Sequence, residues 1–218
     1  MKRNKLFIGS RASKLALIYA NKVKNEISKH YNKEIIIKEI NTTGDNKLDI
    51  RLSELGGKGL FSKNIESELL NKNIDLAVHA LKDLPSFDTE GLITNCFLKR
   101  NDSNEVMISN SNKKLSDLVP GSIVGTSSFR REFQLKRIRK DLNFKLIRGN
   151  VDTRIRKLKN GEYDAIILAK AGLSSLNLDK EITQEFSNND LIPSAGQGTI
   201  GVQCRKDDVD IIELLNKI

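Results

Sequence analysis

The chain has 218 residues, of which 38% are hydrophobic, so it can bury the core of one large domain or two small ones. It contains no apolar run near the ~20 residues that span a bilayer, and its basic first five residues are not followed by a secretory apolar segment. We therefore expect neither a membrane protein nor a secreted protein.

The formal charge of +9 makes nucleic acid the first partner to consider. Only 5% of the residues are aromatic, tryptophan is absent, and no nucleic-acid-binding motif is present. Lysine, asparagine and isoleucine are abundant throughout, which indicates a general compositional bias. The arginines are more specific, because seven of the 12 fall between positions 130 and 156. We expect no nucleic-acid partner and a site for anions in that region.

Cysteine and histidine are scarce, with two of each. Cys96 and Cys204 form neither a disulfide framework nor a metal cluster, which favours a reducing cytoplasm. His30 and His79 stand alone in the sequence, so we expect no metal site. Cys204 falls in a predicted strand and is interpreted as a core thiol.

The first predicted unit is a strand over residues 6–8, a turn that contains Gly9, and a helix with an apolar stripe from Leu15 to Val23. Ser10 or Ser13 can cap this helix. A strand-turn-helix junction of this kind directs backbone N–H groups toward an anion, and Arg11 adds a planar cation. Alone the motif is weak, since capping is a sufficient explanation for the serines.

A second strand is predicted over residues 34–40, followed by a turn over residues 41–45. Three glycines then surround Lys58, before a helix that carries Ile65, Leu69 and Leu70 on one face. The glycines permit a flexible segment that covers a ligand closely. The spacing is not that of a P-loop, and a plain surface loop is an equally good interpretation.

The apolar run over residues 74–78 predicts a buried strand that ends in a polar turn stopped by Pro85. Lys82 and Asp83 therefore follow the carboxyl end of a strand, where open α/β sheets bind ligands. The alternative is that Asp83 only begins a turn and that Lys82 is solvated.

Residues 91–98 predict another strand, and the polar residues 99–104 predict a crossing between domains. Strands over 105–109 and 123–124 come next, and the second leads through Ser127 and Ser128 into a helix. Arg130 and Arg131 lie in the first turn of that helix, where cations oppose the helix dipole. They are poor choices for stability alone, so we interpret them as anion-binding residues.

A strand over residues 144–147 leads through Arg148 and Gly149 into a helix, with Asn150 as its expected cap and Arg154 in its first turn. This is the third strand-glycine-helix junction that carries an arginine, and three such junctions favour one shared polyanion site. Further elements are predicted: a buried strand over 163–169, a short helix from 171, a second crossing over 192–198, a strand over 199–203 and a last helix capped by Asp207 and Asp208.

Strands that alternate with helices predict an α/β fold with mostly parallel sheets. The two crossings predict two domains, the first formed by residues 1–99 plus 198–218 and the second by residues 104–193. We expect domains like those of periplasmic binding proteins, which hold their ligands in a cleft between them.

Six segments occur in the order found in one family: GSRASKLAL (9–17), GGKGLF (56–61), AVHALKDLP (77–85), GTSSFRR (125–131), RGNVDTR (148–154) and GQG (196–198). On these segments the chain resembles the porphobilinogen deaminase (hydroxymethylbilane synthase) family over almost its whole length. The resemblance implies the stepwise condensation of four porphobilinogen molecules to hydroxymethylbilane with release of ammonia, in tetrapyrrole (haem) biosynthesis.

The resemblance also implies roles for individual residues. Each pyrrole carries an acetate and a propionate, so the growing polypyrrole is a polyanion that suits arginine-rich helix starts. Asp83 matches the family carboxylate that stabilises positive charge and moves a proton, with Lys82 and Arg11 beside it. The matching substrate- and cofactor-binding residues are Ser13, Lys58, Ser127, Ser128, Arg130, Arg131, Arg148, Gly149, Arg154 and Gln197.

The family cofactor is a dipyrromethane primer, bound by a thioether to a cysteine of a third domain. The sequence stops at Ile218, before that domain, and neither cysteine matches the attachment residue. Ser175 stands where the family has arginine, with Lys170 as a partial substitute, and Glu54 stands where many relatives have lysine. We expect a monomer without the covalent primer, acting either as the transferase or as a non-catalytic anion-binding module with two domains.

Overall fold

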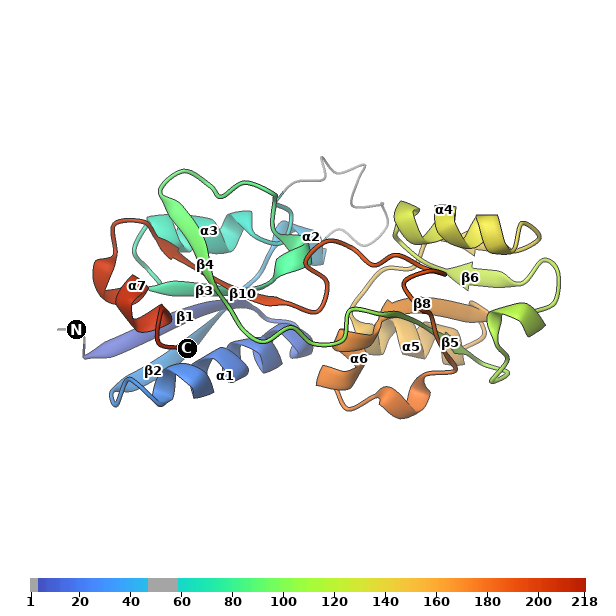
Figure 1. Ribbon diagram of the computed structural model, residues 1–218, viewed down its shortest axis with the longest axis horizontal. Helices are drawn as coiled ribbons and strands as arrows, with labels where there is room; N and C mark the ends of the chain where they lie inside the picture. Colours follow the sequence, from blue (N-terminus) through green and yellow to red (C-terminus); the bar gives the residue numbers. More distant parts are fainter. Residues whose placement is uncertain (1–3, 47–58) are drawn as a thin grey trace. The chain divides into compact units, whose positions relative to one another are not determined.

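The computed structural model describes residues 4–46 and 59–218 (Figure 1). These residues form two compact units, the first from residues 4–46, 59–101 and 199–218 and the second from residues 102–198. The unit boundaries fall within a few residues of the two polar crossings. In the described part of the chain, no helix is long and apolar enough to cross a membrane, and no group of three His, Cys, Asp or Glu side chains is placed to hold a metal ion.

The first unit is built on a five-stranded sheet with the order β2-β1-β3-β10-β4. β1 is parallel to β2 and β3, whereas β10 is antiparallel to both β3 and β4. Its elements are β1 (Lys5–Arg11), α1 (Lys14–Ser28), β2 (Glu34–Ile40), α2 (Thr43–Asn46), α3 (Lys63–Leu70), β3 (Leu76–Ala80), β4 (Leu92–Phe97), β10 (Ile200–Arg205) and α7 (Val209–Leu215).

Helices cover both faces of this sheet because its strands alternate between two buried sides. Leu6 and Ile8 of β1 pack with the buried stripe of α1 and with α7. Ala77 of β3 points to the other face, where Ile65 and Leu69 of α3 complete a smaller core. Figure 1 shows the sheet between α1 and α3. The α3 face also carries the buried polar cluster described below.

The second unit has a five-stranded sheet with the order β7-β6-β8-β5-β9. β6 is parallel to β7 and β8, and β5 is antiparallel to β8 and β9. Its elements are β5 (Glu105–Ser109), β6 (Ile123–Gly125), α4 (Phe129–Ile138), β7 (Asn143–Lys145), α5 (Val151–Lys159), β8 (Ala165–Ala169), α6 (Lys170–Ser175) and β9 (Gln184–Glu185), with 3-10 turns at Leu115–Asp117 and Asp179–Glu181.

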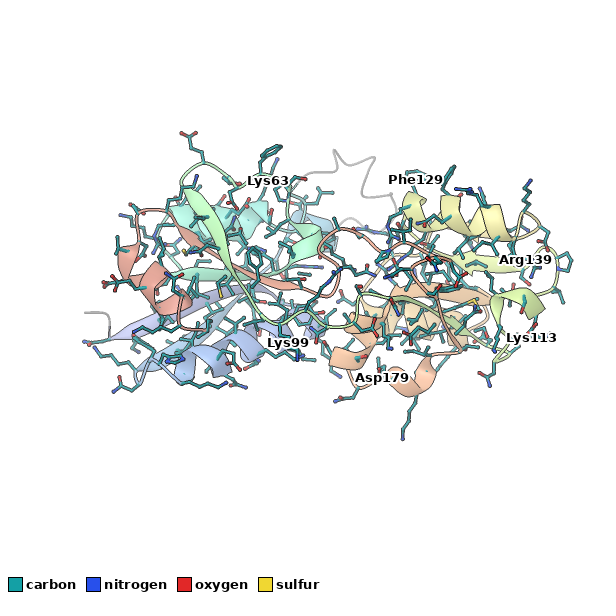
Figure 2. The ribbon with its side chains drawn as sticks, in the orientation of Figure 1. Lys63, Lys99, Lys113, Phe129, Arg139 and Asp179 are labelled. Carbon is teal, nitrogen blue, oxygen red and sulfur yellow. The ribbon has the colours of Figure 1, made fainter. Side chains whose placement is uncertain are left out.

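This second sheet is also buried on both faces. Met107 of β5 packs with Leu135 of α4, whereas Val106 packs with Ile155 of α5 and Leu173 of α6. Near-continuous apolar strands of this kind are typical of a sheet between two helical layers. Figure 2 labels Phe129 and Arg139 near the two ends of α4, the helix whose start carries two of the predicted arginines.

The sheets are mostly parallel, as expected, and each includes one antiparallel strand. This interior strand runs against both of its neighbours, β10 in the first sheet and β5 in the second. β5 starts directly after the first crossing, with Glu105 opposite Ala169, the last residue of β8. β10 starts after the second crossing, with Ile200 opposite Ala80, the last residue of β3. Both crossings therefore enter their sheets at the edge where the parallel strands end.

Candidate functional site

In the first unit, Arg11 and Asp83 lie at the ends of two neighbouring strands. Arg11 is the last residue of β1, and Asp83 ends the 3-10 turn Leu81–Asp83 that follows β3. Because β1 and β3 are paired and parallel, their carboxyl ends reach the same edge of the sheet. An Arg11 Nη1 and an Asp83 Oδ2 are 3.9 Å apart, and the two side chains remain 20% and 32% exposed. The predicted acid and cation therefore meet and remain open to a ligand.

The Arg11 guanidinium also stacks on an aromatic ring. Its central carbon lies 4.1 Å from the centroid of the Phe61 ring. A cation over an aromatic face is held by the negative charge density of that face. Phe61 thereby helps to fix the plane of the guanidinium. It belongs to the GGKGLF segment, but the sequence analysis did not assign it a role.

Two further predicted site residues of this unit, Ser13 and Lys82, lie in a helix cap and in an exposed turn. Ser13 is the N-cap of α1, and its hydroxyl accepts a hydrogen bond of 3.3 Å from the Ala16 N–H. Capping, the alternative raised for this serine, is therefore realised. Lys82 is exposed within the turn that presents Asp83. Lys58 and Glu54 lie outside the described residues.

A buried polar cluster, not predicted from the sequence, lies between α3 and the sheet. The cluster consists of Ser62, Glu66, His79 and Gln203, none more than 7% exposed. The Gln203 amide donates to Glu66 Oε1 over 3.2 Å, and the Ser62 hydroxyl donates to Glu66 Oε2 over 3.3 Å.

The histidine of this cluster is held in its neutral form. Burial lowers the pKa of His79 to about 4, a hydrogen bond with Gln203 opposes that shift, and the charge of Arg11 adds to it. A neutral imidazole beside Arg11 does not compete with the arginine for Asp83. His79 thus supports the charge arrangement at the strand ends.

In the second unit, the two predicted serines at the start of α4 make structural hydrogen bonds. The Ser127 hydroxyl donates to the Ile147 carbonyl, which ties the end of β6 to the segment after β7. Ser128 is the N-cap, and its hydroxyl accepts from the Arg131 N–H over 3.4 Å. Both side chains are only partly buried, so their proposed contact with an anion stays a prediction.

The two arginines in the first turn of α4, Arg130 and Arg131, share one fully buried carboxylate, Glu105 of β5. Arg130 Nη2 lies 2.5 Å from Glu105 Oε1, and Arg131 Nη2 lies 2.6 Å from Oε2. Burial raises the pKa of Glu105, but its ion pairs with Arg131 and Arg130 outweigh burial and hold that pKa below its ordinary value. The cations that oppose the helix dipole are thus balanced by a residue from a neighbouring strand.

The same two arginines differ in what else they contact. Arg131 is buried and donates to the Ile167 carbonyl over 3.0 Å. Arg130 donates to the Ile192 carbonyl and keeps 30% of its side chain exposed. Of the two guanidiniums, that of Arg130 is the more accessible to a ligand.

The third arginine-bearing junction depends on Gly149. Its φ of +104° lies in a region that L side chains rarely adopt, and a Cβ there would lie 2.8 Å from Thr153 Cγ2. Arg154 donates through Nε to the Gly149 carbonyl over 2.7 Å, and Arg148 is 4% exposed. Asn150 occupies the N-cap position as expected, but its side chain makes no capping bond among the described residues.

Gln197 lies on the second crossing and is buried. Its amide donates to the Ser103 carbonyl over 2.8 Å, which ties the second crossing to the first within this unit. Lys170 contacts Asp102 at 2.8 Å and Glu185 at 2.6 Å. These two carboxylates engage its ammonium group, which leaves Lys170 poorly suited to be the partial substitute expected for an arginine at position 175.

Both cysteines are core thiols, as expected for Cys204. Burial raises the pKa of Cys204 to about 11, and burial also raises the pKa of Cys96. A thioether attachment needs an accessible thiolate. Neither side chain offers one.

Solved structures share the fold of this chain. An arginine-specific periplasmic binding protein of Salmonella typhimurium aligns with a TM-score of 0.52 and 15% identity, covering 98% of this chain and 91% of that one. The VFT2 domain of BvgS from Bordetella pertussis aligns with a TM-score of 0.55 and 15% identity, covering 98% and 84%. These likenesses confirm the expected α/β fold class.

Sequence comparison identifies the family. The model described as "Porphobilinogen deaminase, dipyromethane cofactor binding domain" matches residues 6–213. The porphobilinogen deaminase of Lysinibacillus sphaericus is 48% identical over 216 residues, covering 98% of this chain and 70% of that protein. The porphobilinogen deaminase of Bacillus pumilus is 50% identical over 212 residues, covering 95% and 68%. The chain therefore belongs to the porphobilinogen deaminase family.

Proposed function

We propose that this chain catalyses the reaction of its family, the stepwise condensation of four porphobilinogen molecules to hydroxymethylbilane with release of ammonia. One observation carries the assignment to a site: the Arg11–Asp83 pair at the adjoining ends of β1 and β3. Family membership supports the reaction, and the pair supports the place where it occurs.

The chemistry of the pair suits this reaction. Loss of the amine from porphobilinogen leaves an electron-poor azafulvene, whose positive charge extends to the pyrrole nitrogen. A carboxylate beneath that nitrogen stabilises the charge and accepts its proton at an Oδ atom, which is the role we assign to Asp83. Arg11, 3.9 Å away, balances the carboxylate and can bind an acid arm of the substrate. Lys82, in the same turn, adds a second cation.

The residues of the second unit fit the acid arms of the dipyrromethane cofactor. When bound, this group supplies a covalently held primer that the growing chain extends. Four arginines near the starts of α4 and α5 offer planar donors for its carboxylates: Arg130, Arg131, Arg148 and Arg154. Its thioether does not fit either cysteine of this chain, because both thiols are buried.

We also infer that the chain acts as a monomer in the cytoplasm, on small molecules and not on nucleic acid. The two free cysteines support a reducing compartment. The arginines favour a small ligand with carboxylates, because several guanidiniums are already held in fixed orientations by Glu105 or by backbone carbonyls.

The proposal is tested by ammonia release and intact mass after incubation with porphobilinogen. Because neither buried cysteine of this chain offers an attachment point for the primer, the test uses a full-length version that carries the primer. There we expect turnover by the wild type and a loss of at least about 100-fold in Asp83→Asn, the range typical of a general acid-base residue. Asp88→Asn is the matched control, because Asp88 is exposed and accepts a hydrogen bond from the Thr94 hydroxyl.

Circular dichroism checks that both variants fold. Full turnover in folded Asp83→Asn would refute the role of Asp83. Binding of porphobilinogen with neither ammonia release nor added mass would favour the alternative, a non-catalytic anion-binding module.

A further inference from the structure

Glu105 is the one charged residue in an otherwise apolar stretch of β5. It is 0% exposed, and the next three residues, Val106, Met107 and Ile108, are buried apolar side chains. Its two carboxylate oxygens bind two different guanidiniums, each over 2.6 Å or less. The group therefore holds two cations and one anion with a net charge of +1.

Such a group is a poor device for stability. Removing charges from water costs more than their mutual attraction returns unless every partner is well placed. One cation would also be enough to neutralise one carboxylate. A second guanidinium on the same carboxylate indicates that the carboxylate serves the arginines.

The contacts of Arg130 indicate that Glu105 orients its guanidinium. Glu105 binds Nη2, and the Ile192 carbonyl accepts from Nη1, so the guanidinium plane is fixed from two sides. A guanidinium carries five N–H donors, and these two contacts engage only one on each Nη atom. The side chain is 30% exposed, so other donors remain available to an incoming carboxylate.

We infer that Glu105 is a positioning residue that fixes the Arg130 guanidinium for an acid arm of a bound pyrrole, while Arg131 holds the other carboxylate oxygen of Glu105 in place. The inference rests on the proposed function, because it takes the ligand to be a pyrrole carboxylate. A preorganised arginine loses less side-chain freedom on binding than a mobile one, and the affinity is correspondingly higher.

The sign of one mutational effect separates this inference from simple charge balance. Glu105→Gln preserves the size of the side chain and removes one negative charge near an anion site. By charge alone, the variant should bind an anion more tightly. If Glu105 positions Arg130, the variant should bind more weakly, because the guanidinium loses the contact that orients it.

The experiment is calorimetric titration of the full chain with porphobilinogen. We expect Kd to rise about 10-fold in Glu105→Gln, and Glu105→Asp to recover part of the loss because it keeps the charge. The matched control is Glu181→Gln, which removes one negative charge from the exposed Lys159–Glu181 pair in the same unit and should change Kd less than 2-fold. A Kd that falls or stays unchanged in folded Glu105→Gln overturns the inference.

A second measurement, without ligand, separates this inference from the proposed function. In nitrogen-15 NMR spectra, the Arg130 guanidinium should show slowly exchanging Nη signals in the wild type, assigned by their loss in Arg130→Lys. Glu105→Gln should abolish them, and their persistence overturns the inference. If the wild-type chain shows these signals but binds no porphobilinogen, the proposed function fails, and the NMR result for Glu105→Gln alone tests whether Glu105 positions Arg130.

If Glu105→Gln does not fold, Glu105→Asp provides the test. An unchanged Kd and unchanged Nη signals in Glu105→Asp would overturn the inference.

Discussion

His79 illustrates how one buried side chain links stability to pH. Its ring lies next to Gln203, near the carboxyl end of β3, and 7% of the residue is exposed. Burial disfavours the charged imidazolium, and the neighbouring Arg11 disfavours it further. The folded protein therefore keeps this residue neutral under conditions in which an unfolded chain would protonate it.

We predict that His79 lowers the free energy of unfolding as the pH is lowered from 6.5 to about 4. In this window the unfolded state binds the proton first, because the pKa is about 4 in the folded state and 6.5 without its surroundings. Stability is therefore lost as the pH falls, by about 2 kcal/mol between pH 7 and pH 5 for this group.

Urea unfolding of His79→Gln at both pH values measures the effect. The difference between pH 7 and pH 5 should shrink by that amount relative to wild type, whereas His30→Gln, at an exposed position, should leave it unchanged. An undiminished difference in His79→Gln would show that another group titrates in this range.

We predict that Cys204 is inert until the protein unfolds. With a pKa of about 11, about 0.1% of the thiol is ionised at pH 8, and the side chain is buried. In a Cys96→Ala chain, reaction with Ellman's reagent should be negligible in buffer and complete in denaturant. Rapid labelling of the native chain would place Cys204 outside the core.

At the scale of elements, the junction between β7 and α5 depends on a glycine that must adopt positive φ. We predict that Gly149→Ala lowers the free energy of unfolding by about 2–3 kcal/mol, because the backbone strain adds to a 2.8 Å approach of the new Cβ to Thr153. Gly161→Ala is the matched control: its φ is +80°, but no atom lies within 4 Å of the added Cβ. Its cost should be about 1 kcal/mol. Equal melting shifts in the two variants would contradict the steric part of the prediction.

Most helices and strands were predictable because their signal is local. α4 and α5 carry hydrophobic periodicity and follow a serine or asparagine, as the sequence analysis proposed. β9 has two residues and the turn Leu115–Asp117 has three, which is too short for any period. The direction of β5 and β10 could not be predicted, because a fully buried apolar strand has the same pattern either way.

The candidate site also contains residues that the sequence could indicate and residues that only the folded structure brings together. The arginines could be proposed as site residues because they stand at glycine-containing strand ends, a pattern visible along the chain. Glu105 was missed because a glutamate that follows a polar segment has the appearance of an exposed strand end. Gln203 and Glu66 come together only through sheet register and the packing of α3, over 137 positions of sequence.

At the scale of the whole molecule, the two units have separate cores. The core clusters of residues 102–198 share no residue with those of the rest of the chain. We predict that a chain of residues 102–198 alone folds cooperatively, because it is continuous, closes its own five-stranded sheet and is long enough to bury a core. Circular dichroism during thermal unfolding would show one sigmoidal transition. A featureless melt would indicate that the unit depends on the remaining residues.

The position of β10 between β3 and β4 has a consequence for synthesis on the ribosome. Residues 102–198 emerge as one continuous piece, whereas the first sheet waits for its last strand, β10, until Arg205 has left the exit tunnel. Until then, the backbone N–H and C=O groups along one side of β3 have no strand beside them. Unpaired strand edges recruit other chains, so the nascent polypeptide is most vulnerable to aggregation in the interval before β10 has emerged.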